Sequence, residues 1–248
     1  MLIGSANIEE LAARAPVMER LDGEPVTCER ADVLQVMYEI ASPCREAMLP
    51  PGLHPTDPPI VTWLVYRCPE SPWGGFAIAQ TRIECRSGLR LRAFLVSAVV
   101  DNAAAAQALA TRWGFTTQLG QIAVHRHYDS VRVAVAASGR PLLDVVVSDP
   151  EPLSPDDVQY VANMNLAHTP RGLRLLQVEP RYHIHRVERG RPRVTAFDGA
   201  AWGDFRIQPV YPVSASLAAA DFTIPRIRFV CRPDVLAFEG TEAVEDRG

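Results

Sequence analysis

The chain has 248 residues, of which 48% are hydrophobic and 22% are charged, and its formal net charge is −4. This composition fits a globular domain with a sizeable core, and the acidic balance argues against nucleic acid as a partner. The sequence holds no apolar run of about 18 residues and no secretory signal pattern, so we expect a cytoplasmic protein outside the membrane.

Elements of the first half are predicted by the spacing of apolar residues. Helical spacing predicts helices over 5–21, 43–49 and 103–113. Strand patterns cover 31–38, 60–68, 76–88 and 89–100. Pro16 should break or kink the first helix, and the last two strands should form a hairpin that turns near Ser87 and Gly88. Asn102 should cap the alanine-rich helix, which Gly114 ends.

The second half is richer in strands. Strand patterns cover 121–129, 131–138 and 142–149, and recur between 173 and 233. Ser154 as N-cap and Pro155 at the first helical position predict a helix over 154–165, and a short helix is expected around 214–220. The acidic tail over 238–248 is expected to be flexible. Together these patterns predict an antiparallel-rich α+β domain with a curved or closed sheet.

One compositional feature limits the chemistry. All 25 basic side chains are arginine, and the chain contains no lysine. Arginine stays protonated and cannot act as an amine nucleophile, so Schiff-base catalysis by a side chain is excluded. The five cysteines are scattered without a Cys-x-x-Cys pair, which predicts reduced thiols rather than a disulfide framework.

Two His-x-His pairs raise the question of a metal. His125 and His127 form one pair, and His183 and His185 form the other. Residues i and i+2 of a strand share a face, so each pair could bind one ion, with His168 or Glu179 as a further ligand. The alternative is that they are surface histidines among arginines. We predict no metal site, and keep a metal-dependent lyase as an alternative.

Some polar residues of the predicted strands could point into a pocket and are candidate site residues. Gln80 and Arg82 share one face of the strand over 76–85, Tyr66 lies on the apolar 60–68 strand, and Arg30 precedes the first strand. Taken singly, each of them is interpreted first as structural, until a further feature ties them together.

Three segments carry a family resemblance. The first is YEIASPCREAMLPPGLHPTDPPIVTWLVY, and the second is RSGLRLRAFLVSAVVDNAAAAQALATRWGFTTQLGQI. The third runs from LLQVEPRY through FDGAAWG to IPRIRFV. In their order along the chain, these segments resemble the acetoacetate decarboxylase family. The resemblance implies a curved antiparallel sheet that closes into a cone-like β-barrel around a pocket, with short helices outside, in a homo-oligomer. We therefore predict an N-terminal helical segment over 1–24, one barrel domain over 25–237 and the tail over 238–248.

The family's chemistry, as the resemblance implies it, uses a lysine that forms a Schiff base with a β-keto acid. Its Pro-Lys-Lys-Leu-Gly segment is matched by Thr116–Gly120, so that the nucleophile falls on Thr117 and its partner lysine on Gln118. The two pocket glutamates fall near Leu64 and at or near Gln80, and the pocket arginine falls on Ala31 or Arg30. The scaffold is thus expected without the decarboxylase machinery.

These replacements predict a neutral pocket for a larger and more apolar ligand than acetoacetate. The hypothesis is a non-covalent lyase, cyclase or isomerase acting on a carbonyl-bearing, polyketide-like secondary metabolite, without a cofactor. The predicted catalytic residues, which would hydrogen-bond the carbonyl as it becomes an enolate, are Thr117, Gln118 and Gln80. The predicted substrate-binding residues are Arg30, Trp63, Tyr66, Arg82 and His125. Besides the metal-dependent lyase, a non-catalytic small-molecule-binding pseudoenzyme stays open as an alternative.

Overall fold

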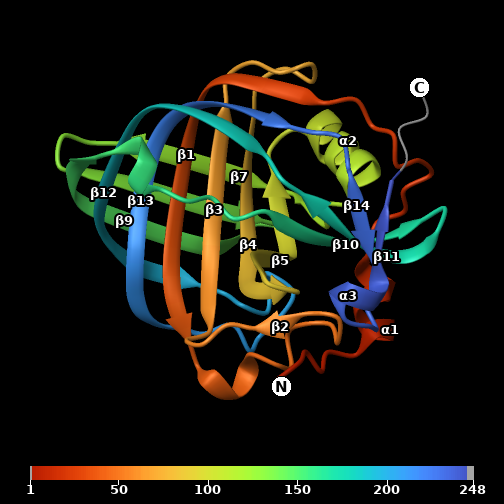
Figure 1. Cartoon of the computed structure of the whole chain (residues 1–248). Helices are drawn as coiled ribbons and strands as arrows, with labels where there is room; N and C mark the ends of the chain where they lie inside the picture. The colour runs from red at the N-terminus through yellow and green to blue at the C-terminus, as the bar shows by residue number, and fades with distance from the viewer. Residues whose placement is uncertain (1, 245–248) are drawn as a thin grey trace.

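A computed structural model describes residues 2–244, and it shows one strongly curved sheet with few short helices (Figure 1). The helices are α1 (Ile8–Arg14), α2 (Ala103–Trp113) and α3 (Ala237–Gly240), with 3-10 turns at Ser42–Cys44 and Pro155–Asp157. The strands are β1 (Val26–Ile40), β2 (His54–Pro55), β3 (Ile60–Cys68), β4 (Phe76–Ser87), β5 (Arg90–Val100), β6 (Thr117–Leu119), β7 (Gln121–Arg126), β8 (Ser130–Ala137), β9 (Arg140–Leu153), β10 (Asn163–Thr169), β11 (Gly172–Val178), β12 (Arg181–Phe197), β13 (Pro209–Ile224), β14 (Phe229–Cys231) and β15 (Thr241–Ala243).

The strand order is β15-β14-β11-β10-β5-β4-β3-β1-β13-β12-β9-β8-β7, with β2 paired to β4 and β6 paired to β5. All pairings are antiparallel except those of β5 with β6 and with β10, so the sheet is mixed. The expected closure into a barrel is wrong: among the described residues the sheet ends at β15 and β7. Strand β5 pairs with β4 on one side and with β6 and β10 on the other, and past Gly120 the chain pairs with β8 as β7.

Both faces of the central strands are buried, and they face two different hydrophobic cores. On β3, Trp63 and Val65 belong to the first core, which β8 and β9 also line. Leu64 and Tyr66 point the other way into the second core, which is covered by α2 and by parts of β10 to β14. Figure 1 shows α2 beside β14 at one end of the curved sheet. Burial on both faces explains why these strands are apolar almost without alternation.

Several predicted elements are confirmed. Strand β3 spans the predicted residues, and β4 and β5 form the predicted hairpin. Helix α2 begins after Asn102, whose side chain accepts from the Ala105 amide, and ends at Gly114 with φ of +68°. This left-handed conformation favours glycine. No helix within residues 2–244 is long and apolar enough to span a membrane.

Four helix predictions are wrong in extent or in kind. Helix α1 covers only Ile8–Arg14, because Pro16 disfavours helical backbone at the residue before it. The N-cap at Ser154 starts a single 3-10 turn, after which the chain is extended as far as β10. The alanine-rich 214–220 segment lies inside β13 and pairs with β1 and β12, so tertiary pairing overrides helix propensity. The 43–49 segment likewise forms a 3-10 turn and bends.

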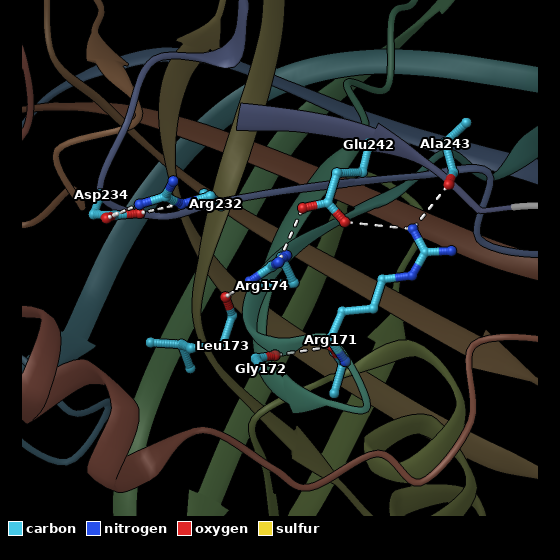
Figure 2. A network of polar contacts seen from close by, with 9 residues as sticks. Arg171, Gly172, Leu173, Arg174, Arg232, Asp234, Glu242 and Ala243 are labelled. Carbon is cyan, nitrogen blue, oxygen red and sulfur yellow. Dashed lines mark hydrogen bonds and ion pairs between the residues drawn. The ribbon is translucent and has the colours of Figure 1, made fainter. Parts of the chain in front are cut away.

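The C-terminal segment is tied to the rest of the sheet. Strand β15 pairs with β14, and Glu242 accepts from Arg174 at 2.9 Å and from Arg171 at 3.4 Å (Figure 2). Arg171 also donates to the Ala243 carbonyl at 2.9 Å. The segment expected to be a flexible tail therefore has regular structure up to Ala243, and its last four residues lie outside the described residues.

Candidate functional site

A stripe of polar side chains crosses the second core on the central strand β4. Gln80, Arg82 and Glu84 alternate along the strand, so they share the face that carries Leu64 and Tyr66 on β3. Their exposed fractions are 1%, 0% and 8%. Polar groups this deeply buried need partners in the protein or in a ligand. We call these three residues the polar stripe.

Asn163 at the start of β10 links two members of the stripe. Its amide nitrogen donates to Gln80 Oε1 at 2.7 Å, and its Oδ1 accepts from Arg82 Nη1 at 2.8 Å. Arg82 Nη1 also donates to the Val161 carbonyl at 3.1 Å. Burial lowers the pKa of Arg82, and the neighbouring hydroxyls of Tyr66 and Tyr182 oppose that shift.

Three tyrosines lie next to the stripe, and we call Tyr66, Tyr160 and Tyr182 the tyrosine cluster. The hydroxyls of Tyr66 and Tyr182 are 2.5 Å apart, and the Tyr160 and Tyr182 rings are 4.6 Å apart. Burial raises the pKa of Tyr66 and Tyr160, and it raises the pKa of Tyr182 to about 12. These hydroxyls are therefore neutral hydrogen-bonding groups at ordinary pH.

Glu84 brings the stripe to the surface. It lines an open groove of about 530 Å³, which we call the groove. Burial raises the pKa of Glu84, while Arg82 and a hydrogen bond from Thr62 at 3.3 Å act in the opposite direction. A carboxyl with a raised pKa at the edge of a groove is suited to proton transfer. The groove is lined by Gln35, Met37, Glu84, Leu91, Leu153, Asp157, Val158, Gln159, Val161, Arg189, Ser214, Ala215 and Ser216.

Thr117 and Gln118 do not converge on one point. Thr117 pairs with Ala98, which pairs with Gln80, so Thr117 lies two strands from Gln80 in one lateral row. Its hydroxyl donates to the Ala106 carbonyl of α2 at 3.3 Å. Gln118 is the next residue on the strand and points to the opposite face, where it donates to the Ala201 carbonyl at 3.3 Å.

Of the other predicted site residues, Tyr66 and Arg82 lie together with Gln80, and three lie elsewhere. Arg30 is on the surface and pairs with Glu70 at 2.5 Å. Trp63 is 1% exposed and packs in the first core, on the opposite face from the stripe. His125 is exposed on the terminal strand β7. Arg30 therefore lies too far out to hold an anionic group beside Gln80, and Arg82 is the arginine beside it.

The histidine pairs do not assemble into a metal centre within residues 2–244, where no three His, Cys, Asp or Glu side chains are grouped to hold an ion. His185 bonds Asp221 at 2.9 Å. The suggested further ligands bond elsewhere: His168 contacts the Ala12 carbonyl at 3.0 Å, and Glu179 pairs with Arg92 at 2.7 Å. The five cysteines are free, as predicted.

Sequence reasoning missed Glu84, Asn163, Tyr160 and Tyr182. Glu84 had a signal, because QTRIE continues the alternation of Gln80 and Arg82 on a strand that is otherwise apolar. The other three come from the segment around β10 and from β12, and only tertiary pairing brings them to β4.

The curved mixed sheet matches the acetoacetate decarboxylase-like fold. The acetoacetate decarboxylase (ADC) family model matches residues 14–232, and the chain therefore belongs to that family. The crystal structure of acetoacetate decarboxylase from Legionella pneumophila subsp. pneumophila str. Philadelphia 1 is similar with a TM-score of 0.73 and 17% identity, covering 98% of this chain and 99% of the other.

Two further solved structures share the fold. The enduracididine biosynthesis enzyme MppR, complexed with pyruvate, has a TM-score of 0.68 and 17% identity, and the match covers 92% of each chain. An acetoacetate decarboxylase-like enzyme from Sphingomonas wittichii RW1 has a TM-score of 0.65 and 17% identity, and the match covers 83% of this chain and 92% of the other. A search of curated proteins found no match.

Proposed function

We propose that this protein is a non-covalent lyase, cyclase or isomerase that acts on a carbonyl-bearing, polyketide-like secondary metabolite. The observation that carries the proposal is the polar stripe, which joins a buried arginine and a glutamate of raised pKa on one face of a chain without lysine. Proton transfer and charge stabilisation are the chemistry these groups can supply, and neither needs an imine.

In the proposed reaction, Glu84 takes a proton from the carbon next to the substrate carbonyl, and the carbonyl becomes an enolate. Gln80 and Thr117, which lie in one row with only Ala98 between them, supply hydrogen bonds to the oxygen once the Thr117 hydroxyl turns away from the Ala106 carbonyl. Arg82 balances the negative charge. Return of the proton at another atom gives isomerisation, and departure of a leaving group from the β-carbon together with that proton gives elimination. Attack of the enolate carbon on a second carbonyl of the same molecule, whose oxygen takes the proton from Glu84, gives cyclisation. No cofactor takes part in these steps.

The solved relatives support a carbonyl ligand. MppR has been solved with pyruvate and with the condensation product of pyruvate and imidazole 4-carboxaldehyde, so this fold accommodates carbonyl compounds in that protein. A homo-oligomer in the cytoplasm remains part of the proposal from the family resemblance, and light scattering on the purified protein measures its assembly.

The test is exchange of the α-proton of 3-oxooctanoate and of larger polyketide-like diketones in D₂O, followed by NMR. Glu84→Gln should slow exchange by about 100-fold or more. Glu179→Gln is the matched control, because this glutamate pairs with Arg92 and does not line the groove. Tight binding of these compounds without any exchange would favour the pseudoenzyme, and equal rates in the Glu84→Gln variant would remove the proposed mechanism.

A further inference from the structure

Arg82 is a buried guanidinium with one edge unused. Its side chain is 0% exposed, and only Nη1 is hydrogen-bonded, to Asn163 Oδ1 and the Val161 carbonyl. Nε and Nη2 have no hydrogen-bond partner within the described part of the chain. These two N–H groups lie along the same edge of the guanidinium, which is an edge that a carboxylate can bind with two parallel hydrogen bonds.

Within residues 2–244, the other buried arginine and the half-buried Arg174 have carboxylate partners. Arg92, whose exposed fraction is 7%, pairs with Glu179 at 2.7 Å, and Arg174 pairs with Glu242 at 2.9 Å. Arg82 is more deeply buried than either, and none of the ion pairs recorded for residues 2–244 includes it; Glu84, two residues along the strand, acts on Arg82 through space and without a hydrogen bond. Because a buried charge is costly unless it is paired, the unpartnered edge of Arg82 suits a bound anion.

The surroundings of Arg82 define what kind of anion fits. Tyr160 Oη and Ser216 Oγ are buried and interact with each other, and within the described residues they have no further hydrogen-bond partner, so both hydroxyls can turn to a ligand. Ser216 and Val161 also line the groove, so the groove adjoins this site. Much of the groove wall is apolar, with contributions from Met37, Leu91, Leu153, Val158 and Val161.

We propose that this face binds an amphiphilic carboxylic acid, with the carboxylate on Arg82 Nε and Nη2 and the apolar body in the groove. The inference rests on the proposed function only in placing the ligand on this face of the sheet. The segment over 158–162 joins the two parts of the site, because Val158, Gln159 and Val161 line the groove and the Val161 carbonyl accepts from Arg82 at 3.1 Å. Gln35 also holds this segment by donating to the Gln159 carbonyl at 3.3 Å. In the proposed complex this segment has to shift so that the carboxylate can reach Arg82.

Calorimetric titration of the full chain with unreactive probes tests the inference. Octanoate carries the head and the body, octanamide replaces the charge by a neutral amide, and propanoate lacks the body. Wild type should bind octanoate at least 10-fold more tightly than either of the others. Arg82→Met should remove the preference for octanoate over octanamide, whereas Arg92→Met, the matched control, should keep it. Equal affinities for octanoate and octanamide in wild type, or equal losses in the two variants, would overturn the proposal.

Two further measurements keep the test decisive if Arg82→Met fails to fold. Asn163→Asp places a carboxylate against Arg82, so it should weaken octanoate binding at least 10-fold and leave octanamide binding unchanged. It should also raise the melting temperature of the ligand-free protein, because the buried charge gains a partner. A lower melting temperature with unchanged octanoate binding would show that Arg82 is purely structural and would overturn the inference.

Binding and turnover separate the two proposals. Octanoate has no ketone, so its binding does not depend on catalysis. Octanoate binding that depends on Arg82 without exchange of 3-oxo compounds would reject the enzyme and keep the site. Exchange of 3-oxo compounds by a wild type whose octanoate binding does not depend on Arg82 would reject the site and keep the enzyme.

Discussion

Replacement of Asn163 by alanine should cost far more stability than replacement of its neighbour Asn165. Both side chains lie on the same face of β10, with exposed fractions of 3% and 0%. Asn163 makes two side-chain bonds, to Gln80 at 2.7 Å and from Arg82 at 2.8 Å, whereas Asn165 makes one, to the Trp113 carbonyl at 2.8 Å. Asn163→Ala leaves a buried amide oxygen and a buried cation short of a partner.

Each buried polar group left without its partner costs about 1–3 kcal/mol, with charged groups at the upper end, so Asn163→Ala should lose about 3–5 kcal/mol. Asn165→Ala should lose about 1–2 kcal/mol, because one bond is broken and its already unpartnered Oδ1 is removed. Urea unfolding with a common m-value measures both. In an Arg82→Met background the cost of Asn163→Ala should fall, since the cation is absent. Equal losses for the two alanine variants would refute the view that the stripe depends on Asn163.

The remaining predictions concern one carboxyl, one hydroxyl and one backbone position. Burial raises the pKa of Glu84 above its ordinary 4.5. The protonated carboxyl therefore stabilises the folded state fully below pH 4.5, and this stabilisation is lost as the pH rises through the raised pKa. The free energy of unfolding in urea, measured against pH, should show this decline in wild type and not in Glu84→Gln. Tyr66→Phe leaves the buried Tyr182 hydroxyl without this partner and should lower the free energy of unfolding by about 1–2 kcal/mol in the same assay. An unchanged free energy of unfolding would contradict a stabilising Tyr66–Tyr182 hydrogen bond. Gly114→Ala should lower the free energy of unfolding by about 2–4 kcal/mol, because the new Cβ would lie 2.7 Å from a carbon of Leu176. Gly139 has a similar φ and nothing within 4 Å of the new Cβ, so Gly139→Ala should lower it by only about 1 kcal/mol. Similar melting temperatures for the two variants would contradict this difference.

Local signals predicted the parts of the fold that local energetics determine. Helix α2 has an asparagine cap, an alanine body and a glycine that adopts positive φ, and all of these act within one segment. The β4–β5 hairpin has a glycine turn between two strand patterns. The 214–220 segment lacked such local control: its alanines favour a helix, but the segment lies between β1 and β12, and a strand satisfies the backbone groups of both neighbours. Pairing with strands distant in sequence therefore determines that this segment is a strand.

The candidate site divides in the same way. Alternation along one strand predicted that Gln80 and Arg82 share a face, and the same rule applied two residues further on includes Glu84. The rule also separates Thr117 from Gln118, because adjacent residues of a strand face opposite sides, so their joint action on one carbonyl was not compatible with β6. Arg30 could be placed only by the structure, where the chain outside the core pairs it with Glu70.

The protonation states on this face restrict the chemistry further. Arginine does not release its proton, and the raised pKa values of the tyrosine cluster allow these hydroxyls to donate hydrogen bonds but not to act as bases near neutral pH. Within the polar stripe and the tyrosine cluster, Glu84 is then the group that can both accept and return a proton. In the proposed reaction, proton transfer depends on Glu84, and in the proposed binding site Arg82 sets the charge of the ligand. The proposed enzyme needs both Glu84 and Arg82, whereas a non-catalytic binding protein with the same site needs only Arg82.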